Sequence, residues 1–305
     1  MFTHGVNPLL LFWHRRHTGT MTEYMHNPTV DVLLDRRSIR AFQQEPIDPQ
    51  TLTTIEAAAQ HAASSQYLHD WSAIRILDHT LKQQIAEVGH QPYIADAAAL
   101  YVFVLDEYRN AVIARNSGVA VDSDEFTLNN SYRFSQAQND AVLALHAMET
   151  AAESLGLGCV ILGSILNDVP RLIELMKLPE YTYPVLGLAI GKPAQQPNLK
   201  PRLPRSVQFF DNAYNSDPKL MLQRMSEFNE EVHQYYDLRD AAHPVPTYDA
   251  QIAQKAVDQG VLERGLGHAR AGVRHRTLAA HQRCRGLNPR LRECGLRCSA
   301  RCVRM

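Results

Sequence analysis

One nearly continuous apolar run, AALYVFVLD over Ala98–Asp106, most constrains what this chain can fold into. The run has the length of a β-strand, and the lack of alternation is typical of a central strand buried on both faces. Such a strand needs helices packed on each side of its sheet. Because strand-like and helix-like segments alternate along the chain, we predict a mixed α/β (α+β) fold. Its central mixed sheet should have four or five strands and be flanked by helices.

Further elements are indicated by apolar spacing and by residues that cap helices. Strands are predicted at Ser72–Leu77, in CVILGS from Cys159, and in YPVLGLAIGKP from Tyr183. Helices are predicted after Asp48, from Asp78 to Gly89, over Gln136–Leu155, near Val169–Met176 and around Pro218–Tyr236. The alanines of Gln136–Leu155 are frequent enough to let another helix approach closely.

Composition excludes several classes of protein. The 305 residues carry a net charge of −1, which gives no global reason to expect a nucleic-acid or anionic-membrane partner. No apolar run approaches the ~18 residues of a membrane span. The opening NPLLLFWHRRH places its basic residues after its apolar stretch, the wrong order for a secretory signal. We therefore expect a cytoplasmic protein, with Met21 or Met25 as an alternative start and residues 1–27 as a disordered extension.

The last part of the chain differs sharply from the rest. From Asp258 to Met305 there are eleven arginines, no lysine and three acidic residues. Four of the five cysteines lie there, whereas the body holds only Cys159, which argues against a disulfide framework. The spacing of Cys294, Cys298 and Cys302 lacks the turn and histidine context of a zinc site, so no metal is expected.

Two basic clusters are candidates for an anion site. The stretch LDRRSIRAF contains Arg36, Arg37, Ser38 and Arg40, and NLKPRLP contains Lys200 and Arg202 beside prolines that stiffen the loop. One interpretation is a solvated surface cluster that caps a helix; the other is a socket for a phosphate, which guanidinium groups bind bidentately. The apolar residues Leu33, Leu34 and Phe42 are expected to anchor the first cluster in the core.

Smaller polar features fit either a site or ordinary loops. Ser64 and Ser65 in AASSQYL follow a helix, where hydroxyl groups bind a sugar-like chain or simply end the helix. Gln91 in GHQPY is an amide that suits a heteroaromatic edge or solvent. GLGCVILG contains G-x-G, but it leads from a helix into a strand, the reverse of the dinucleotide fingerprint.

Four stretches together resemble one family. RRSIRAF, AASSQYL, AAESLGLGCVILGS and LGLAIGKPAQQPNLKPRLP are similar, in order and spacing, to the nitroreductase superfamily over about Val30–Leu238. The closest resemblance is to the oxygen-insensitive, NADPH-dependent nitroreductases and FMN reductases of group A. It implies an FMN enzyme built as an intertwined homodimer, with the flavin at the subunit interface.

The resemblance assigns residues to this site. FMN would be bound by Arg36, Arg37, Ser38, Arg40, Ser64, Ser65, Tyr67, Gln91, Ile161, Gly163, Ser164, Lys200 and Arg202. The arginines, Lys200 and Arg202 would hold the phosphate, and Arg239 would contact NADPH. No catalytic side chain is implied, because the flavin carries the hydride.

The resemblance also implies a reaction. Hydride would pass from NADPH through FMN to nitroaromatics, quinones or free flavin in a ping-pong sequence. One alternative is a flavin reductase that supplies reduced FMN to a partner. A nucleic-acid-binding protein that uses the basic tail is a distant alternative, because that tail lacks aromatic residues for stacking.

We assign residues 28–257 to one FMN-binding domain, and beyond about Val257 no likeness to the family remains. The closing helix and substrate-pocket arginine that the family would supply cannot be placed in residues 258–305. The abrupt change in composition is what a shifted reading frame would produce, and a natural divergent tail is the alternative. We expect this segment to be largely disordered.

Overall fold

The computed structural model describes residues 24–121, 123, 126–235 and 245–261. The chain divides into two compact units. One holds residues 36–196 and carries the sheet; the other combines the described parts of 1–35 and 197–257. Most of the N-terminal extension and most of the tail, both expected to be disordered, lie outside these ranges. Within them, no helix is both long and apolar enough to cross a membrane.

The sheet consists of four strands in the order β1-β2-β4-β3. They are β1 (Trp71–Arg75), β2 (Ala99–Asp106), β3 (Gly158–Leu162) and β4 (Thr182–Gly191). Strands were predicted at all four places. Each neighbouring pair is antiparallel, and in the described chain parallel pairing is confined to an isolated bridge between Ser38 and Cys159.

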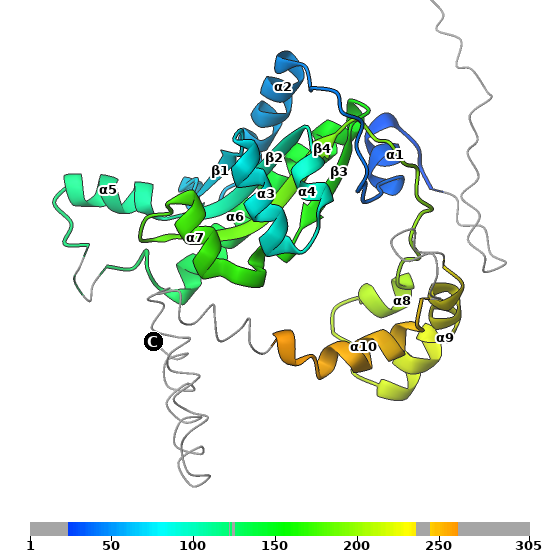
Figure 1. Ribbon diagram of the computed structural model, residues 1–305. Helices are drawn as coiled ribbons and strands as arrows, with labels where there is room; N and C mark the ends of the chain where they lie inside the picture. The colour runs from blue at the N-terminus through cyan, green and yellow to red at the C-terminus, as the bar shows by residue number, and fades with distance from the viewer. Residues whose placement is uncertain (1–23, 122, 124–125, 236–244, 262–305) are drawn as a thin grey trace, which may run out of the picture. The chain divides into compact units, whose positions relative to one another are not determined.

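Helices cover both faces of the sheet (Figure 1). On one face lie α3 (His79–Gly89), α4 (Tyr93–Asp96) and α7 (Val169–Met176); on the other lie α2 (Pro49–Gln60) and α6 (Ser131–Ser154). All residues of β2 from Ala99 to Leu105 are buried, as the apolar run predicted. Alternate residues of β2 pack on opposite faces, for example Val102 in the cluster with α3 and Phe103 in the cluster with α6.

The helix boundaries follow from capping side chains. Asp48 caps α2 by accepting from the Thr51 amide at 3.0 Å, and Asp78 caps α3 through the Leu81 amide at 2.7 Å. Helix α6 begins at Ser131 rather than at the predicted Gln136, because Asn130 caps it through the Arg133 amide. It ends before Gly156, whose φ of 80° lies in the left-handed region that favours glycine.

The remaining elements of the sheet-bearing unit are short. They are the short 3-10 helices η1 (Ser65–Tyr67) and η2 (Ser164–Asp168) and the α-helix α5 (Tyr108–Asn116).

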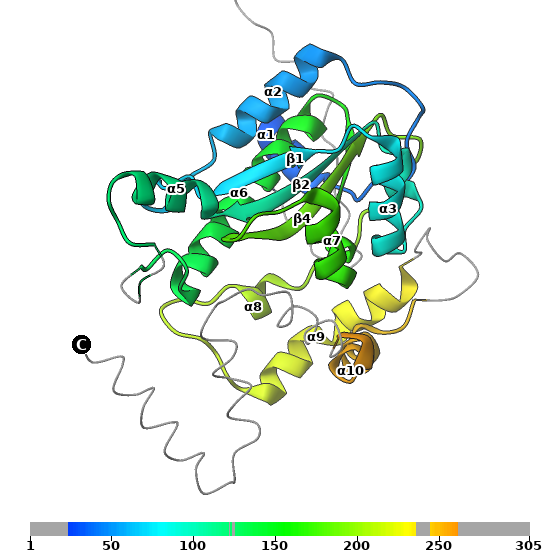
Figure 2. The ribbon, with the colours of Figure 1, turned by 60° about the vertical axis from the view of Figure 1, so that its left-hand side comes forward.

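The second unit is helical. It contains α1 (Pro28–Leu34), α8 (Arg205–Gln208), α9 (Pro218–Gln234) and α10 (Tyr248–Ala256). Helices α9 and α10 lie side by side (Figure 2), where Phe228 is buried and its ring meets that of Tyr248 edge-on at 5.1 Å.

The expected anchoring of Leu33 and Leu34 is wrong for this chain, since both side chains are exposed. The seven-residue helix α1 buries none of its residues, so its apolar side chains have no core to enter. Of the three expected anchors, Phe42 alone is buried, in the sheet-bearing unit.

Residues 36–43, here called the edge segment, run along β3 and the end of β4. The Ile39 amide donates to the Cys159 carbonyl and the Gln43 amide to the Lys192 carbonyl, both at 2.9 Å. Ile39 is buried against Gly158, where an added Cβ would lie 2.8 Å from both Cγ atoms of Ile39. The lack of a side chain at residue 158 therefore lets the edge segment approach the sheet.

We predict that Gly158→Ala lowers the free energy of unfolding by about 1–3 kcal/mol, because the new methyl group overlaps Ile39. Urea unfolding of the apoprotein measures this change. Gly163→Ala is the matched control, since the nearest atom to its added Cβ is 4.0 Å away. The control should stay within about 0.5 kcal/mol of the unsubstituted protein. Equal stabilities for the two variants would contradict the close approach.

Candidate functional site

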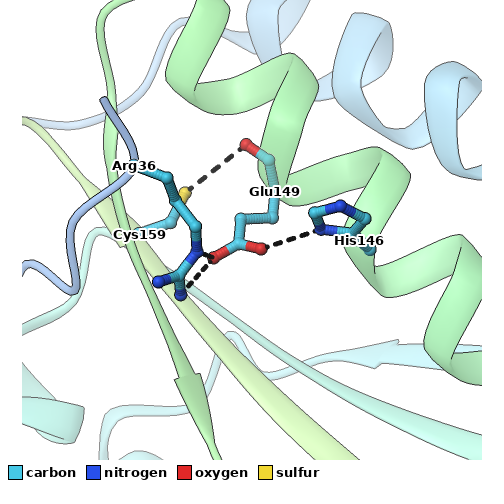
Figure 3. Close-up of polar contacts among 4 residues, drawn as sticks. All are labelled: Arg36, His146, Glu149 and Cys159. Atoms are coloured by element: carbon cyan, nitrogen blue, oxygen red, sulfur yellow. Dashed lines mark hydrogen bonds and ion pairs between the residues drawn. The ribbon is translucent and has the colours of Figure 1, made fainter. Parts of the chain in front are cut away.

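Arg36 begins the edge segment, and its guanidinium group is committed to a buried carboxylate. Its Nε and Nη2 atoms lie 2.9 and 2.8 Å from Glu149 Oε1 (Figure 3). The Glu149 side chain, on α6, is only 1% exposed, and its other oxygen lies 3.1 Å from His146 Nδ1. Because a buried carboxylate is costly without a cation, this pair ties the start of the edge segment to α6.

Cys159 lies beside the Arg36–Glu149 ion pair, but its surroundings do not activate its thiol as a nucleophile. Its Sγ atom is 4.0 Å from the Glu149 carbonyl oxygen, a long contact that Figure 3 shows beside the ion pair. Burial, followed by the negative charges of Glu153 and Glu149, raises the pKa of this thiol well above its usual value. The thiol therefore stays protonated and unreactive.

The other polar residues of the edge segment are partly exposed. Arg37, Ser38 and Arg40 flank the buried Ile39. The Arg40 amide donates to Gln195 Oε1 at 3.0 Å, which fixes the backbone at that residue. Its guanidinium group makes no ion pair or hydrogen bond with the residues that the structure describes. A half-buried cation with no counter-charge from the described chain is suited to an external anion.

The second predicted group lies on a loop with unusual backbone geometry. Ser64 and Ser65 begin this loop, and Gln66, Tyr67 and His69 have φ values of 53°, 59° and 48°, in the left-handed region. Residues with a side chain rarely adopt this conformation, so the loop has to be held by its surroundings. Ser64 Oγ contributes by accepting from the His69 amide at 2.8 Å.

A polar stripe on α6 holds this loop. Asp140 accepts from the Ser65 amide at 3.1 Å, and Gln136 Nε2 donates to Ser65 Oγ at 2.6 Å. Arg133 Nη1 donates to the side-chain oxygens of both Gln66 and Gln136 at 2.8 Å. Sequence reasoning missed this stripe. The available signal was polar side chains at helical spacing among the buried alanines of α6.

The third group lies where α3 and β3 end. The backbone amide of Gln91 donates to the Ala86 carbonyl. The side-chain oxygen Gln91 Oε1 accepts a hydrogen bond from Tyr93 Oη. Ile161 lies in β3, and Gly163 follows that strand and is exposed. Ser164 Oγ is buried with no hydrogen-bond partner among the described residues, and an added Cβ at Gly89 would lie 3.2 Å from it.

Eleven of the thirteen predicted FMN residues thus belong to the sheet-bearing unit. The edge segment pairs with β3, Gly163 and Ser164 follow the same strand, and the Ser64–His69 loop rests on α6, which also carries Glu149.

Three of the predicted site residues are not among the described residues of the sheet-bearing unit. Lys200 and Arg202 belong to the other unit, where Arg202 Nη1 donates to the Lys200 carbonyl at 3.0 Å. Arg239 lies outside the described residues.

In the described ranges, no three His, Cys, Asp or Glu side chains are grouped so that they could hold a metal ion. The four cysteines of the tail lie outside those ranges.

Comparison with known proteins identifies the family. Residues 33–192 match the model of the nitroreductase family, and residues 200–267 match the model of its C-terminal domain. The second match continues past Val257, so the likeness reaches further into the tail than the sequence resemblance indicated.

Individual relatives support the same family assignment. An NADPH-dependent oxidoreductase of Staphylococcus haemolyticus is 36% identical over 241 residues, which are 76% of this chain and 91% of that protein. Nitroreductase A from Vibrio parahaemolyticus has a TM-score of 0.68 at 30% identity, over 77% of this chain and 92% of its own. The NADPH:FMN oxidoreductase of Vibrio harveyi, in a complex with NAD+, has a TM-score of 0.67 at 29% identity, over 76% and 92%. The chain therefore belongs to the nitroreductase family and is an oxidoreductase.

Proposed function

We propose that this protein binds FMN and uses NADPH to reduce nitroaromatics, quinones or free flavin. The observation that carries the proposal is Arg40, a half-buried cation that no carboxylate of the described chain neutralises. Arg37 and Ser38 lie beside it on a backbone fixed to β3. The relatives named as NADPH-dependent and NADPH:FMN oxidoreductases support the choice of both nucleotides.

The chemistry of the donor groups fits FMN. Guanidinium groups and the Ser38 hydroxyl suit a phosphate monoester. The hydroxyl groups of Ser64, Ser65 and Tyr67 suit a ribityl chain. Gln91, Ile161, Gly163 and Ser164 would lie against the ring, and the exposed backbone of Gly163 suits contact with a flat ligand. Lys200 and Arg202 would add charge at the phosphate, a part of the proposal that rests on sequence resemblance.

The chain's own residues bind and orient rather than transfer protons. Tyr93 fixes the orientation of the Gln91 amide, and the α6 stripe fixes the Ser64–His69 loop. Arg36 would position the edge segment through Glu149 and leave Arg37 and Arg40 to face the ligand. Bound FMN supplies the hydride acceptor and donor, so that NADPH and the acceptor would use one place in turn, with ping-pong kinetics.

Two details of the reaction rest on resemblance. Arg239 would contact the extra phosphate of NADPH and give a preference over NADH. A flavin reductase that supplies reduced FMN to a partner is the second candidate, favoured by the name of the Vibrio harveyi neighbour. Comparing the rates for free FMN and for nitrofurans would distinguish the two activities.

We also propose an intertwined homodimer located in the cytoplasm. Val142 and Leu143 on α6, and Val112 and Ile113 on α5, expose apolar side chains that a second copy would cover. The cytoplasmic location rests on the single cysteine of residues 1–257. Light scattering of the FMN-loaded protein should give the mass of two chains; a flavin-loaded monomer would contradict the shared site.

We predict that Arg40→Ala weakens FMN binding about 10- to 100-fold, because charge-assisted hydrogen bonds to the phosphate are lost. The double variant Lys200→Ala/Arg202→Ala should lose at least as much affinity. Equilibrium dialysis followed by flavin absorbance measures both. The unfolding free energy of the Arg40→Ala apoprotein should stay within about 0.5 kcal/mol of the unsubstituted protein. Full retention of FMN in both variants would contradict the phosphate assignment.

Arg36→Ala is the matched comparison, because Arg36 pairs with a protein carboxylate. It should lower the unfolding free energy of the apoprotein by about 3 kcal/mol, since Glu149 is left buried without its cation. The same substitution in a Glu149→Gln background should cost clearly less, because no charge remains to be compensated. Equal losses in both backgrounds would show that the ion pair is not what Arg36 contributes.

A further inference from the structure

Three acidic side chains are buried beneath the Ser64–His69 loop. Asp70 ends the loop and is 0% exposed, Glu107 precedes α5 and is 2% exposed, and Asp140 on α6 is 2% exposed. The backbone brings the first two together, because the Asp106 amide donates to the Asp70 carbonyl at 2.8 Å. Buried carboxylates are normally paired with cations or fully hydrogen-bonded, so this arrangement needs a physical explanation.

The three carboxyl groups have different partners. Asp140 accepts from the Ser65 amide through both of its oxygens, at 3.1 and 3.3 Å. Glu107 Oε2 accepts from Asn110 Nδ2 at 3.3 Å. Both carboxyl oxygens of Asp70 are buried and accept no hydrogen bond from the described residues. The groups that act on the Asp70 carboxyl group are the neighbouring carboxyl groups of Asp140 and Glu107.

Two carboxyl groups form a hydrogen bond only when one of them carries a proton. Asp140 already accepts from the Ser65 amide, whereas Asp70 receives nothing from the described chain, so Asp70 is the natural donor. Burial, the hydrogen bond to Asp140, and the charges of Glu107 and Asp140 raise the pKa of Asp70 to about 7. Burial likewise raises the pKa of Glu107. Hydrogen bonds with Asn110 and Asp70 and the charge of Arg133 oppose this rise, and the charge of Asp106 adds to it.

We propose that protonated Asp70 donates to Asp140 and thereby holds Asp140 against the Ser65 amide, which makes Asp70 a pH-sensitive positioning residue for the Ser64–His69 loop. The consequence for flavin affinity rests on the proposed function, in which this loop contacts FMN. The hydrogen-bonding role of Asp70 does not depend on it.

The Ser64–His69 loop depends on hydrogen bonds from neighbouring elements. Three of its residues with side chains have positive φ, and Ser65 is held from α6 by Asp140 and Gln136. From the α5 side, Arg109 Nη2 donates to the carbonyls of His69 and Trp71. An Asp140 side chain repelled by a charged Asp70 would release the Ser65 amide, and the left-handed backbone would then lose a main restraint.

The direction of the pH effect follows from the raised pKa of Asp70. The folded protein holds a proton that the unfolded chain releases near 3.8, the usual pKa of an aspartate side chain. This contribution to stability is therefore fully present below pH 3.8, declines as the pH rises above that value, and is lost once the pH has risen through about 7. Above that pH the fold has to keep two adjacent negative charges buried beside Glu107.

The test compares the unsubstituted protein with Asp70→Asn from about pH 5.5 to about pH 8.5. The asparagine amide donates to Asp140 without titrating. The melting temperature of the unsubstituted apoprotein should fall by about 4 °C or more relative to Asp70→Asn over this range. FMN affinity should weaken about tenfold more in the unsubstituted protein than in Asp70→Asn. Asp211→Asn, which neutralises an exposed carboxylate of the other unit, should behave as the unsubstituted protein does.

Asp70→Ala provides the second variant, because it removes the donor and the charge together. Its FMN affinity should be reduced at every pH, whereas Asp70→Asn keeps the affinity that the unsubstituted protein has at acidic pH. This rescue by the amide distinguishes positioning of the loop from simple filling of space.

Parallel pH profiles for the unsubstituted protein and Asp70→Asn would overturn the proposal. Failure of Asp70→Asn to fold, or a loss of FMN equal to that of Asp70→Ala, would do the same. If none of the proteins bound FMN at any pH, the proposed function would fail. The melting-temperature comparison would still decide whether Asp70 shares a proton with Asp140.

Discussion

Helix α6 carries the polar side chains on which both halves of the candidate site depend. At one end Glu149 binds Arg36 and fixes the start of the edge segment; nearer the other end Asp140 and Gln136 bind Ser65. The same helix packs its alanines and Met148 against the sheet, so these polar groups sit on a rigid element. Side chains positioned from one packed helix keep their mutual geometry better than side chains on independent loops.

Buried acidic side chains are tolerated at two places in this arrangement, for different reasons. Burial of Glu149 is compensated by a guanidinium group, whereas burial of Asp70 is compensated by keeping a proton. The second solution depends on pH, because the Asp70 proton is lost as the pH rises through about 7. A site built from both should have a firmly held phosphate-facing segment and a loop whose order depends on pH.

The sequence predicted those features that depend on local pattern. The continuous apolar run at Ala98–Asp106 gave β2, and Asp48 and Asp78 gave the starts of α2 and α3. The start of α6 was missed, because its capping residue Asn130 lies outside the apolar periodicity. Leu33 and Leu34 were wrongly expected in the core, since an apolar pair on a short helix does not show whether a core lies nearby.

Features that depend on distant partners were beyond sequence reasoning. The arginine cluster was singled out, yet nothing local indicated that Arg36 would pair with Glu149, 113 residues away. Asp70, Glu107 and Asp140 are likewise far apart in the chain and meet only once β1, α5 and α6 are packed. The family resemblance supplied candidate ligands for FMN, but it did not distinguish residues that face a ligand from residues that hold the backbone in place.

The central claim is that bound FMN accepts electrons from NADPH in this protein. The most direct measurement is the visible flavin absorption of the purified protein, recorded without oxygen before and after one equivalent of NADPH. The account predicts a yellow protein whose flavin band bleaches with NADPH faster than with NADH, and returns when a quinone or nitroaromatic is added. A protein that stays colourless after incubation with FMN, or whose flavin band is unchanged by NADPH, would contradict it.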